Sequence, residues 1–265
     1  MSGPTAGLPQ VRVHRDATLL ARAVAARLVT RLVDAQAAGQ QASLVLTGGA
    51  IGIQVLTEVT AAPARDAVDW RSLHIWWGDE AFLPSGDPAR VETQARAALL
   101  DHVDVSQDRV HPMPSLDGPD GSDQDAAADR YASALRTAAL AAGNDAVPAF
   151  DVLLLGIGPD AHVASLFPGM PALTEDGRSV VGVTAAPKPP PTRISLTLPA
   201  IRSARDVWIV AAGSEQADAV ARALSSADPV RVPAAGARGR QQTLFLLDRD
   251  AAGRVQPRTD RIAQP

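Results

Sequence analysis

Short apolar runs alternate with amphipathic segments along most of the chain. Leu20, Val24, Leu28 and Leu32 recur every four residues, which predicts a helix over residues 16–38. Runs that are apolar throughout predict buried strands, and they lie at 43–49, 73–77, 151–158, 179–184, 193–198, 206–213 and 243–248. Further helices are predicted at 51–59, 91–102, 123–142, where Ser122 is a candidate cap, 161–166 and 215–225.

This alternation predicts an α/β fold with an open, mainly parallel sheet and helices on both faces, as in Rossmann-like proteins. One sheet passing through the whole chain favours a single domain over residues 11–248, with the proline-rich segment 185–193 as a rigid loop or a hinge. Residues 1–9 and 249–265 are polar and interrupted by proline and glycine, so we expect loose ends there.

Composition and charge exclude several function classes. The formal net charge is −4, so no basic field favours nucleic acid or an anionic membrane. No cysteine is present, which excludes disulfides and thiolate sites and suits a reducing cytosol. The apolar runs are far shorter than the ~20 residues of a membrane helix, and no signal peptide is evident. We therefore expect a cytoplasmic protein without a membrane or nucleic-acid partner, either a monomer or a small homo-oligomer.

Glycine and polar residues gather where predicted strands end. Ligands of open α/β sheets bind beyond the carboxyl ends of the strands. Gly48 and Gly49 in "LTGGAIG" would let the backbone approach a ligand, and the helix N-terminus after them suits a phosphate, although a plain tight turn explains them equally well.

Two further strands carry charged candidates. Asp79 and Glu80 follow the strand 73–77, where paired carboxylates can bind sugar hydroxyls or orient a base; a helix or turn cap is the alternative. No histidine with ligand spacing stands nearby, so we expect no metal. Arg193 begins the strand 193–198, where its guanidinium could bind phosphate or simply face solvent.

The segment "GIGPDAHVASLFPG" carries the strongest signal. Gly156 and Gly158 open the end of a buried strand, Asp160 is placed to orient a neighbour, and His162 can exchange a proton near neutral pH. The helix predicted at 161–166 would add N–H groups for an anion. The other four histidines lie in segments without such neighbours.

The motifs "LVLTGG", "IWWGDEAFLP", "DVLLLGIGPDAHVASLFPG" and "RISLTLPAI", in this order, resemble the 6-phosphogluconolactonase family over roughly residues 11–248. The resemblance implies a sugar-phosphate isomerase/lactonase type of sheet and hydrolysis of a phosphorylated sugar lactone in the pentose phosphate pathway, without metal or cofactor. It implies that His162 is the general base and that Asp160 orients it. The loop at Gly48 and Gly49 would hold the substrate phosphate together with Arg193.

Departures from the family pattern leave two alternatives open. The pattern has arginine where this chain has Ala81, asparagine at Val91, glycine at Ala161 and lysine at Gln216. Lost phosphate contacts favour a weakened sugar-phosphate-binding homologue as one alternative. The other is an amino-sugar-phosphate isomerase or deaminase of the same fold. The segment "VASLFPG" disfavours it, because those enzymes have an "AFNEP"-like stretch at this position.

Overall fold

The fully apolar runs form one parallel sheet. The computed structural model describes residues 8–39, 41–225 and 227–256, and its six-stranded sheet has the order β1-β9-β8-β5-β2-β3. Every neighbouring pair in it is parallel. The strands are β1 (Gln10–His14), β2 (Ser43–Leu46), β3 (His74–Trp77), β5 (Val152–Gly156), β8 (Asp206–Ala211) and β9 (Gln242–Asp248). The mainly parallel α/β fold is confirmed; β1 is a strand that the sequence pattern missed.

Helices connect these strands close to the predicted positions. They are α1 (Ala17–Ala37), α2 (Gly49–Ala61), α3 (Val91–Ala98), α4 (Gln124–Ala141), α5 (Leu198–Arg202), α6 (Ala217–Leu224) and α7 (Pro233–Gly236). Asp16 caps α1, since its carboxylate accepts a hydrogen bond from the Leu19 N–H. Asp123, rather than the expected Ser122, caps α4 in the same way.

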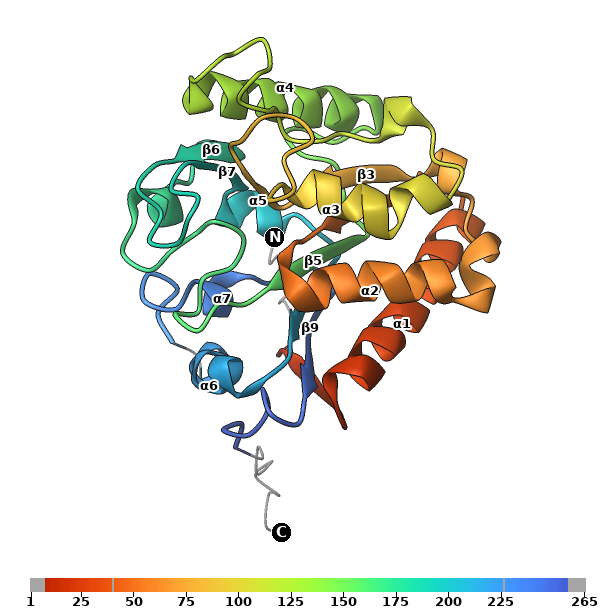
Figure 1. Ribbon diagram of the computed structural model, residues 1–265, viewed down its shortest axis with the longest axis vertical. Helices are drawn as coiled ribbons and strands as arrows, with labels where there is room; N and C mark the ends of the chain where they lie inside the picture. The colour runs from red at the N-terminus through yellow and green to blue at the C-terminus, as the bar shows by residue number, and fades with distance from the viewer. Residues whose placement is uncertain (1–7, 40, 226, 257–265) are drawn as a thin grey trace, which may run out of the picture.

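The connections reverse direction between β2 and β5. Those leaving β1 and β2 run toward the β3 edge, whereas those leaving β3, β5 and β8 run back toward β1. Right-handed crossovers therefore put α1 and α2 on one face and α4 and α6 on the other. Figure 1 shows α1 and α2 to the right of the strands and α6 and α7 to the left.

The expectation of one sheet through the whole chain was wrong. Three strands form a separate antiparallel sheet in the order β4-β7-β6: β4 (Asp79–Ala81), β7 (Arg193–Leu196) and β6 (Val180–Val183). Apolar strands in a parallel and an antiparallel sheet look alike when both faces are covered, and α4 packs on β6 and β7 here.

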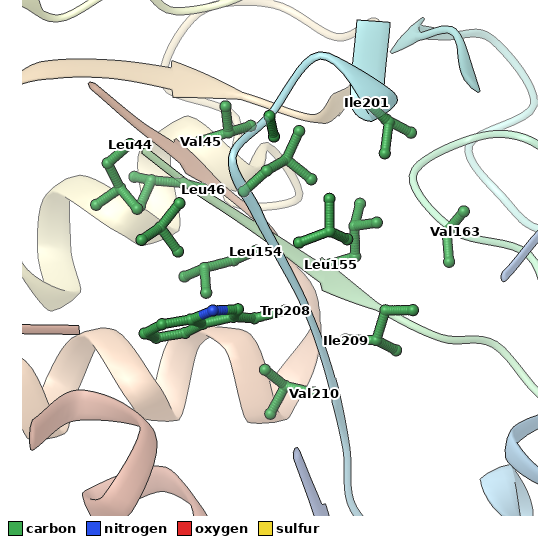
Figure 2. Close-up of a cluster of buried hydrophobic side chains, with 14 of the residues drawn as sticks. Leu44, Val45, Leu46, Leu154, Leu155, Val163, Ile201, Trp208, Ile209 and Val210 are labelled. Carbon is green, nitrogen blue, oxygen red and sulfur yellow. The ribbon is translucent and has the colours of Figure 1, made fainter. Parts of the chain in front are cut away.

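The side chains of the central strands form the hydrophobic core. Figure 2 shows Leu154 and Leu155 of β5 and Trp208 of β8 among the side chains of β2. All three are at most 1% exposed. Ile201 of α5 and Val163, from the loop after β5, lie in the same cluster. The loop that carries His162 is thus anchored in the core.

The predicted helix over 161–166 is absent. Val163 and Leu166 instead form an isolated antiparallel bridge, and the Leu166 N–H donates to the Val163 carbonyl at 3.0 Å. Ala161 and Ala164 have φ of 73° and 49°, values that a right-handed helix cannot include. The loop therefore offers no helix N-terminus for an anion.

The expected loose C-terminal end begins with an ordered turn. Ala251 is fully buried and its N–H donates to Asp248 at 2.8 Å. Residues 257–265 and 1–7 lie outside the described residues.

Glu80 is buried beneath the start of α3. Its two carboxylate oxygens accept hydrogen bonds from the backbone N–H groups of Ala81, Val91 and Glu92 at 2.7 to 2.9 Å. The Arg90 guanidinium lies 3.8 Å away, and both side chains are at most 1% exposed. Burial raises the pKa of Glu80 to about 7, against the opposing charge of Arg90. This carboxylate joins β4 to α3.

We expect Glu80→Ala to lower the free energy of unfolding by about 3 to 5 kcal/mol, because it removes one of the two carboxylates beside the buried Arg90 and the acceptor of three backbone N–H groups. Asp104→Ala is the control, since its ion pair with Arg71 is exposed and should contribute less than about 1 kcal/mol. Urea unfolding measures both. Equal effects of the two substitutions would contradict a structural role for Glu80.

Candidate active site

The carboxyl ends of β2 and β5 form the topological switch point of the sheet, the position at which ligands of this fold class bind. The β2 strand ends at Leu46 and is followed by Thr47, Gly48 and Gly49, and the neighbouring β5 ends at Gly156. The Gly156 N–H donates to the Thr47 hydroxyl at 3.2 Å, which ties the two strand ends together. The glycine loop and the histidine loop therefore leave the sheet side by side.

His162 and Asp160 form a hydrogen-bonded pair. The His162 Nδ1 lies 2.5 Å from a carboxylate oxygen of Asp160. Burial raises the pKa of Asp160, but the hydrogen bond and charge of His162, with the charge of Lys188, bring it below its ordinary value. An ionised Asp160 accepts, so Nδ1 carries the proton and donates, and Nε2 keeps its lone pair.

Gly158 makes room for this pair. A Cβ on Gly158 would collide with the His162 ring and with the Asp160 carboxylate. On another side, the Phe167 ring lies 4.5 Å from that of His162, centroid to centroid. The His162 side chain is 18% exposed, so its ring is packed in place yet reachable from solvent.

Ala161, between Asp160 and His162, holds a left-handed backbone conformation. Its φ is 73°, a region that favours glycine, and its N–H donates to the Gly158 carbonyl at 2.8 Å. Its own carbonyl accepts the Ala234 N–H at 3.0 Å, from the short helix α7. These two bonds fix the turn that carries His162, at the cost of strain in an alanine.

Asp79 and Arg193 meet on the face of the small sheet that the histidine loop covers. Their side chains lie 3.8 Å apart, and neither is more than 18% exposed. The Ser165 hydroxyl donates to Asp79 at 2.6 Å, while the Ser165 N–H donates to the Ser195 hydroxyl at 3.1 Å. Ser165 thus links the loop after β5 to β4 and β7.

Arg193 is oriented by the proline-rich loop. Its Nε and one terminal nitrogen donate to the carbonyls of Pro190 and Pro189, both at 3.1 Å. Ala81 lies opposite Arg193 in the antiparallel register, so their Cβ atoms are roughly 5 Å apart. An arginine at position 81 would emerge beside Arg193.

The glycine loop opens the N-terminus of α2. Gly49 has φ of 79°, and a Cβ on Gly48 would meet Val91 at 2.6 Å. Neither Gly48 nor the first turn of α2 carries a side-chain cap or an acidic residue. The first N–H groups of this helix are therefore suited to an anion.

The structure thus groups most of the predicted site residues at one end of the sheet, but not all of them. Glu80, predicted to contact substrate, is instead fully buried and accepts hydrogen bonds from the first N–H groups of α3. Gly48, Gly49, Gly156, Gly158, Asp160 and His162 flank the switch point, and Asp79 and Arg193 join it through Ser165.

Two residues of this region were missed from the sequence, and a third was noted only as the chain's single lysine. Ser165 and Ser195 are fully buried serines whose role depends on a contact between distant segments, which no local pattern signals. Lys188, the chain's single lysine, places its charge near Asp160 from an exposed position on the proline-rich loop. Its rarity was the one available signal.

In residues 8–39, 41–225 and 227–256, no three His, Asp or Glu side chains gather as ligands for a metal ion. No helix in this part of the chain is both long and apolar enough to cross a membrane.

Comparison with known proteins gives one consistent result. The family model described as glucosamine-6-phosphate isomerases/6-phosphogluconolactonase matches residues 15–246. The chain is 59% identical to a 6-phosphogluconolactonase of Streptomyces coelicolor, over 93% of this chain and 95% of that protein. It is 50% identical to one of Mycobacterium tuberculosis, over 92% and 98%.

A solved structure agrees with these relatives. The 6-phosphogluconolactonase of Trypanosoma brucei superposes with a TM-score of 0.79 and 27% identity, covering 95% of this chain and all of that one. The match of the family model spans both strands of the switch point and the histidine loop between β5 and β6. The chain belongs to the glucosamine-6-phosphate isomerase/6-phosphogluconolactonase family.

Proposed function

We propose that this protein hydrolyses 6-phosphoglucono-δ-lactone to 6-phosphogluconate, in the oxidative branch of the pentose phosphate pathway. The relatives with 59% and 50% identity carry the name 6-phosphogluconolactonase, which favours this activity over that of a deaminase. The observation that carries the proposal is the His162–Asp160 pair beside the carboxyl ends of β2 and β5.

In the proposed mechanism, His162 acts through Nε2. A water attacks the lactone carbonyl carbon while Nε2 takes one of its protons, and the imidazolium is stabilised by the carboxylate of Asp160. When the tetrahedral intermediate collapses, the bond from C1 to the ring oxygen breaks. Nε2 returns the proton to that oxygen, and the product is the open-chain acid. These steps use only side chains and water.

The phosphate of the substrate is proposed to bind between the α2 N-terminus and Arg193. Both present N–H donors, and Arg193 is pre-oriented by the Pro189 and Pro190 carbonyls. Lys188 adds a second positive charge from the same loop. These groups are our candidates to replace the arginine that the family pattern has at position 81. Asp79, held by Ser165, is a candidate for substrate hydroxyls.

The absence of cysteine fits a reducing compartment, so we propose a cytoplasmic enzyme. We propose that it acts as a monomer or small homo-oligomer and needs no cofactor.

His162→Ala should lower the rate of lactone hydrolysis ~10²–10⁴-fold, because the general base is lost. Asp160→Asn should lower it less, because the imidazole stays while its tautomer is no longer fixed. Release of 6-phosphogluconate from fresh lactone, read by a coupled dehydrogenase and corrected for spontaneous opening, measures both. The exposed His102→Ala is the matched control. A wild type that does not accelerate hydrolysis would favour the weakened homologue, and an unchanged His162→Ala would remove His162 from the mechanism.

Arg193→Gln should lower kcat/KM for the phosphorylated lactone roughly 10- to 150-fold, the cost of one hydrogen bond to a charged group at about 1.5–3 kcal/mol. Hydrolysis of unphosphorylated glucono-δ-lactone by the same variant separates phosphate binding from a structural role of Arg193. We expect that slow reaction to be unchanged. An equal loss with both substrates would mean that Arg193 only supports the loop.

Ala161→Val should lower both stability and turnover, because a β-branched residue at φ of 73° is strained by about 1–3 kcal/mol and displaces its neighbours Asp160 and His162. Ala161→Gly should change the free energy of unfolding by less than about 1 kcal/mol, because relief of strain is offset by a more flexible unfolded chain and a lost buried methyl. Thermal unfolding and the lactone assay test the pair. If Ala161→Val changed neither the stability nor the turnover, the proposed role of this turn would be contradicted.

A further inference from the structure

Phe167 is a buried aromatic residue of the histidine loop, and the proposed mechanism gives it no role. The centroid of its ring lies 4.5 Å from that of His162, and the two ring planes are tilted by 38°. Only 2% of Phe167 is exposed, so water does not separate the two rings. Their separation is at the short end of the range for interacting rings, about 4.5–7 Å. The phenyl ring therefore packs directly against the imidazole.

Phe167 also packs on the small antiparallel sheet. It forms a hydrophobic cluster with Val181 and Val183 of β6, separate from the main core. Val183 lies opposite Arg193 in the antiparallel register, and Val181 lies opposite Ser195. Residues that are directly opposite each other point to the same face of a sheet. Phe167 therefore lies against the face that carries Arg193, and it connects this face to the His162 ring.

The backbone is fixed on both sides of Phe167. Two residues before it, the Ser165 hydroxyl donates to Asp79 and the Ser165 N–H donates to the Ser195 hydroxyl. Three residues after it, the Met170 N–H donates to the Phe167 carbonyl at 3.2 Å. The phenyl ring is held by these bonds and by its cluster, so it forms a fixed wall beside the imidazole.

The His162 ring needs such a wall, because its other contacts leave it free to tilt. Its Nδ1 is bound to Asp160, but a single hydrogen bond allows the ring to turn about that contact. Gly158 has no Cβ and so leaves space beside the ring. Nε2, the atom proposed to take the proton of water, has no hydrogen-bond partner in the described part of the chain. The direction of Nε2 therefore depends on Phe167.

We propose that Phe167 is a positioning residue for lactone hydrolysis, an inference that rests on the proposed function. Its ring fixes the direction of the His162 Nε2 relative to the sheet face that carries Arg193. Arg193 is the proposed anchor of the substrate phosphate, so the base has to meet the carbonyl of the same molecule at a set distance from that anchor. A misplacement of about 1 Å can lower a rate ~10²-fold. In this role Phe167 acts through His162 and not on the substrate.

Phe167→Leu keeps an apolar side chain but removes the flat ring. We expect kcat to fall roughly 10- to 100-fold and KM to change less than about threefold, because the base is misdirected while the phosphate contacts remain. The same loss of kcat is expected with unphosphorylated glucono-δ-lactone, since both substrates need the base. Arg193→Gln differs from this pattern, because it should affect only the phosphorylated lactone.

Two further variants separate positioning from packing. Phe150→Leu is the matched control, because Phe150 is fully buried just before β5, at the opposite edge of the sheet from the histidine loop. It should lower the temperature of thermal unfolding and leave kcat unchanged. Phe167→Tyr keeps the ring, so kcat should stay within about threefold of the wild type even though the added buried hydroxyl lowers stability.

The Nδ1–H signal of His162 tests the same point without turnover. In the ¹⁵N-histidine-labelled full chain, it is the Nδ1–H signal that disappears in His162→Ala. We expect it to be sharp in the wild type, because the proton is donated to Asp160 in a packed ring. It should broaden or disappear in Phe167→Leu and remain in Phe167→Tyr and Phe150→Leu.

An unchanged kcat in Phe167→Leu would overturn the proposal, and so would an equal loss of kcat in Phe150→Leu or in Phe167→Tyr. A loss confined to the phosphorylated lactone would overturn it as well, because Phe167 would then support the phosphate site and not the base. A wild type that does not hydrolyse the lactone contradicts the proposed function. The Nδ1–H signal then decides by itself whether Phe167 orients His162.

Discussion

The parallel pairing of β2 with β5 is the constraint on which the rest of the candidate active site depends. These strands are neighbours, yet the chain leaves them in opposite directions, which opens the sheet at their carboxyl ends. The core secures this arrangement, because the side chains of both strands are buried on both faces. The loops that follow are then brought together without having to contact each other extensively.

Steric limits within the histidine loop fix the orientation of the His162 side chain beside that opening. Gly158 has no Cβ, so the His162 ring lies against the backbone and reaches Asp160. Ala161 takes a left-handed conformation to let the chain turn, held by bonds to Gly158 and Ala234. Ser165 then attaches the loop to the small sheet that carries Arg193. The base and the proposed phosphate-binding arginine are thus parts of one connected structure.

The sequence predicted the features that local patterns record. Apolar runs identified the central strands, and the four-residue spacing of Leu20 to Leu32 identified α1. The motif around His162 predicted that Asp160 would orient the imidazole, and the two side chains are hydrogen-bonded in the structure.

What the sequence could not predict depends on contacts between distant segments. β7 has the same apolar pattern as a parallel strand and pairs antiparallel with β4 instead. Glu80 sits beside Asp79 in the chain, but successive residues of a strand point to opposite faces, so one meets α3 and the other Arg193. The residue types at 161–166 are typical of a helix, but the positive φ of Ala161 and Ala164 prevents a helix from forming there.

The most direct test of this account is the tautomer of the His162 imidazole, measured by ¹⁵N NMR of the histidine-labelled protein above the pH at which the ring loses its charge. We predict a proton on Nδ1, donated to Asp160, and a bare Nε2 directed to substrate. A proton on Nε2 with Nδ1 bare would contradict the account, because the atom proposed to accept the proton of water would already hold one.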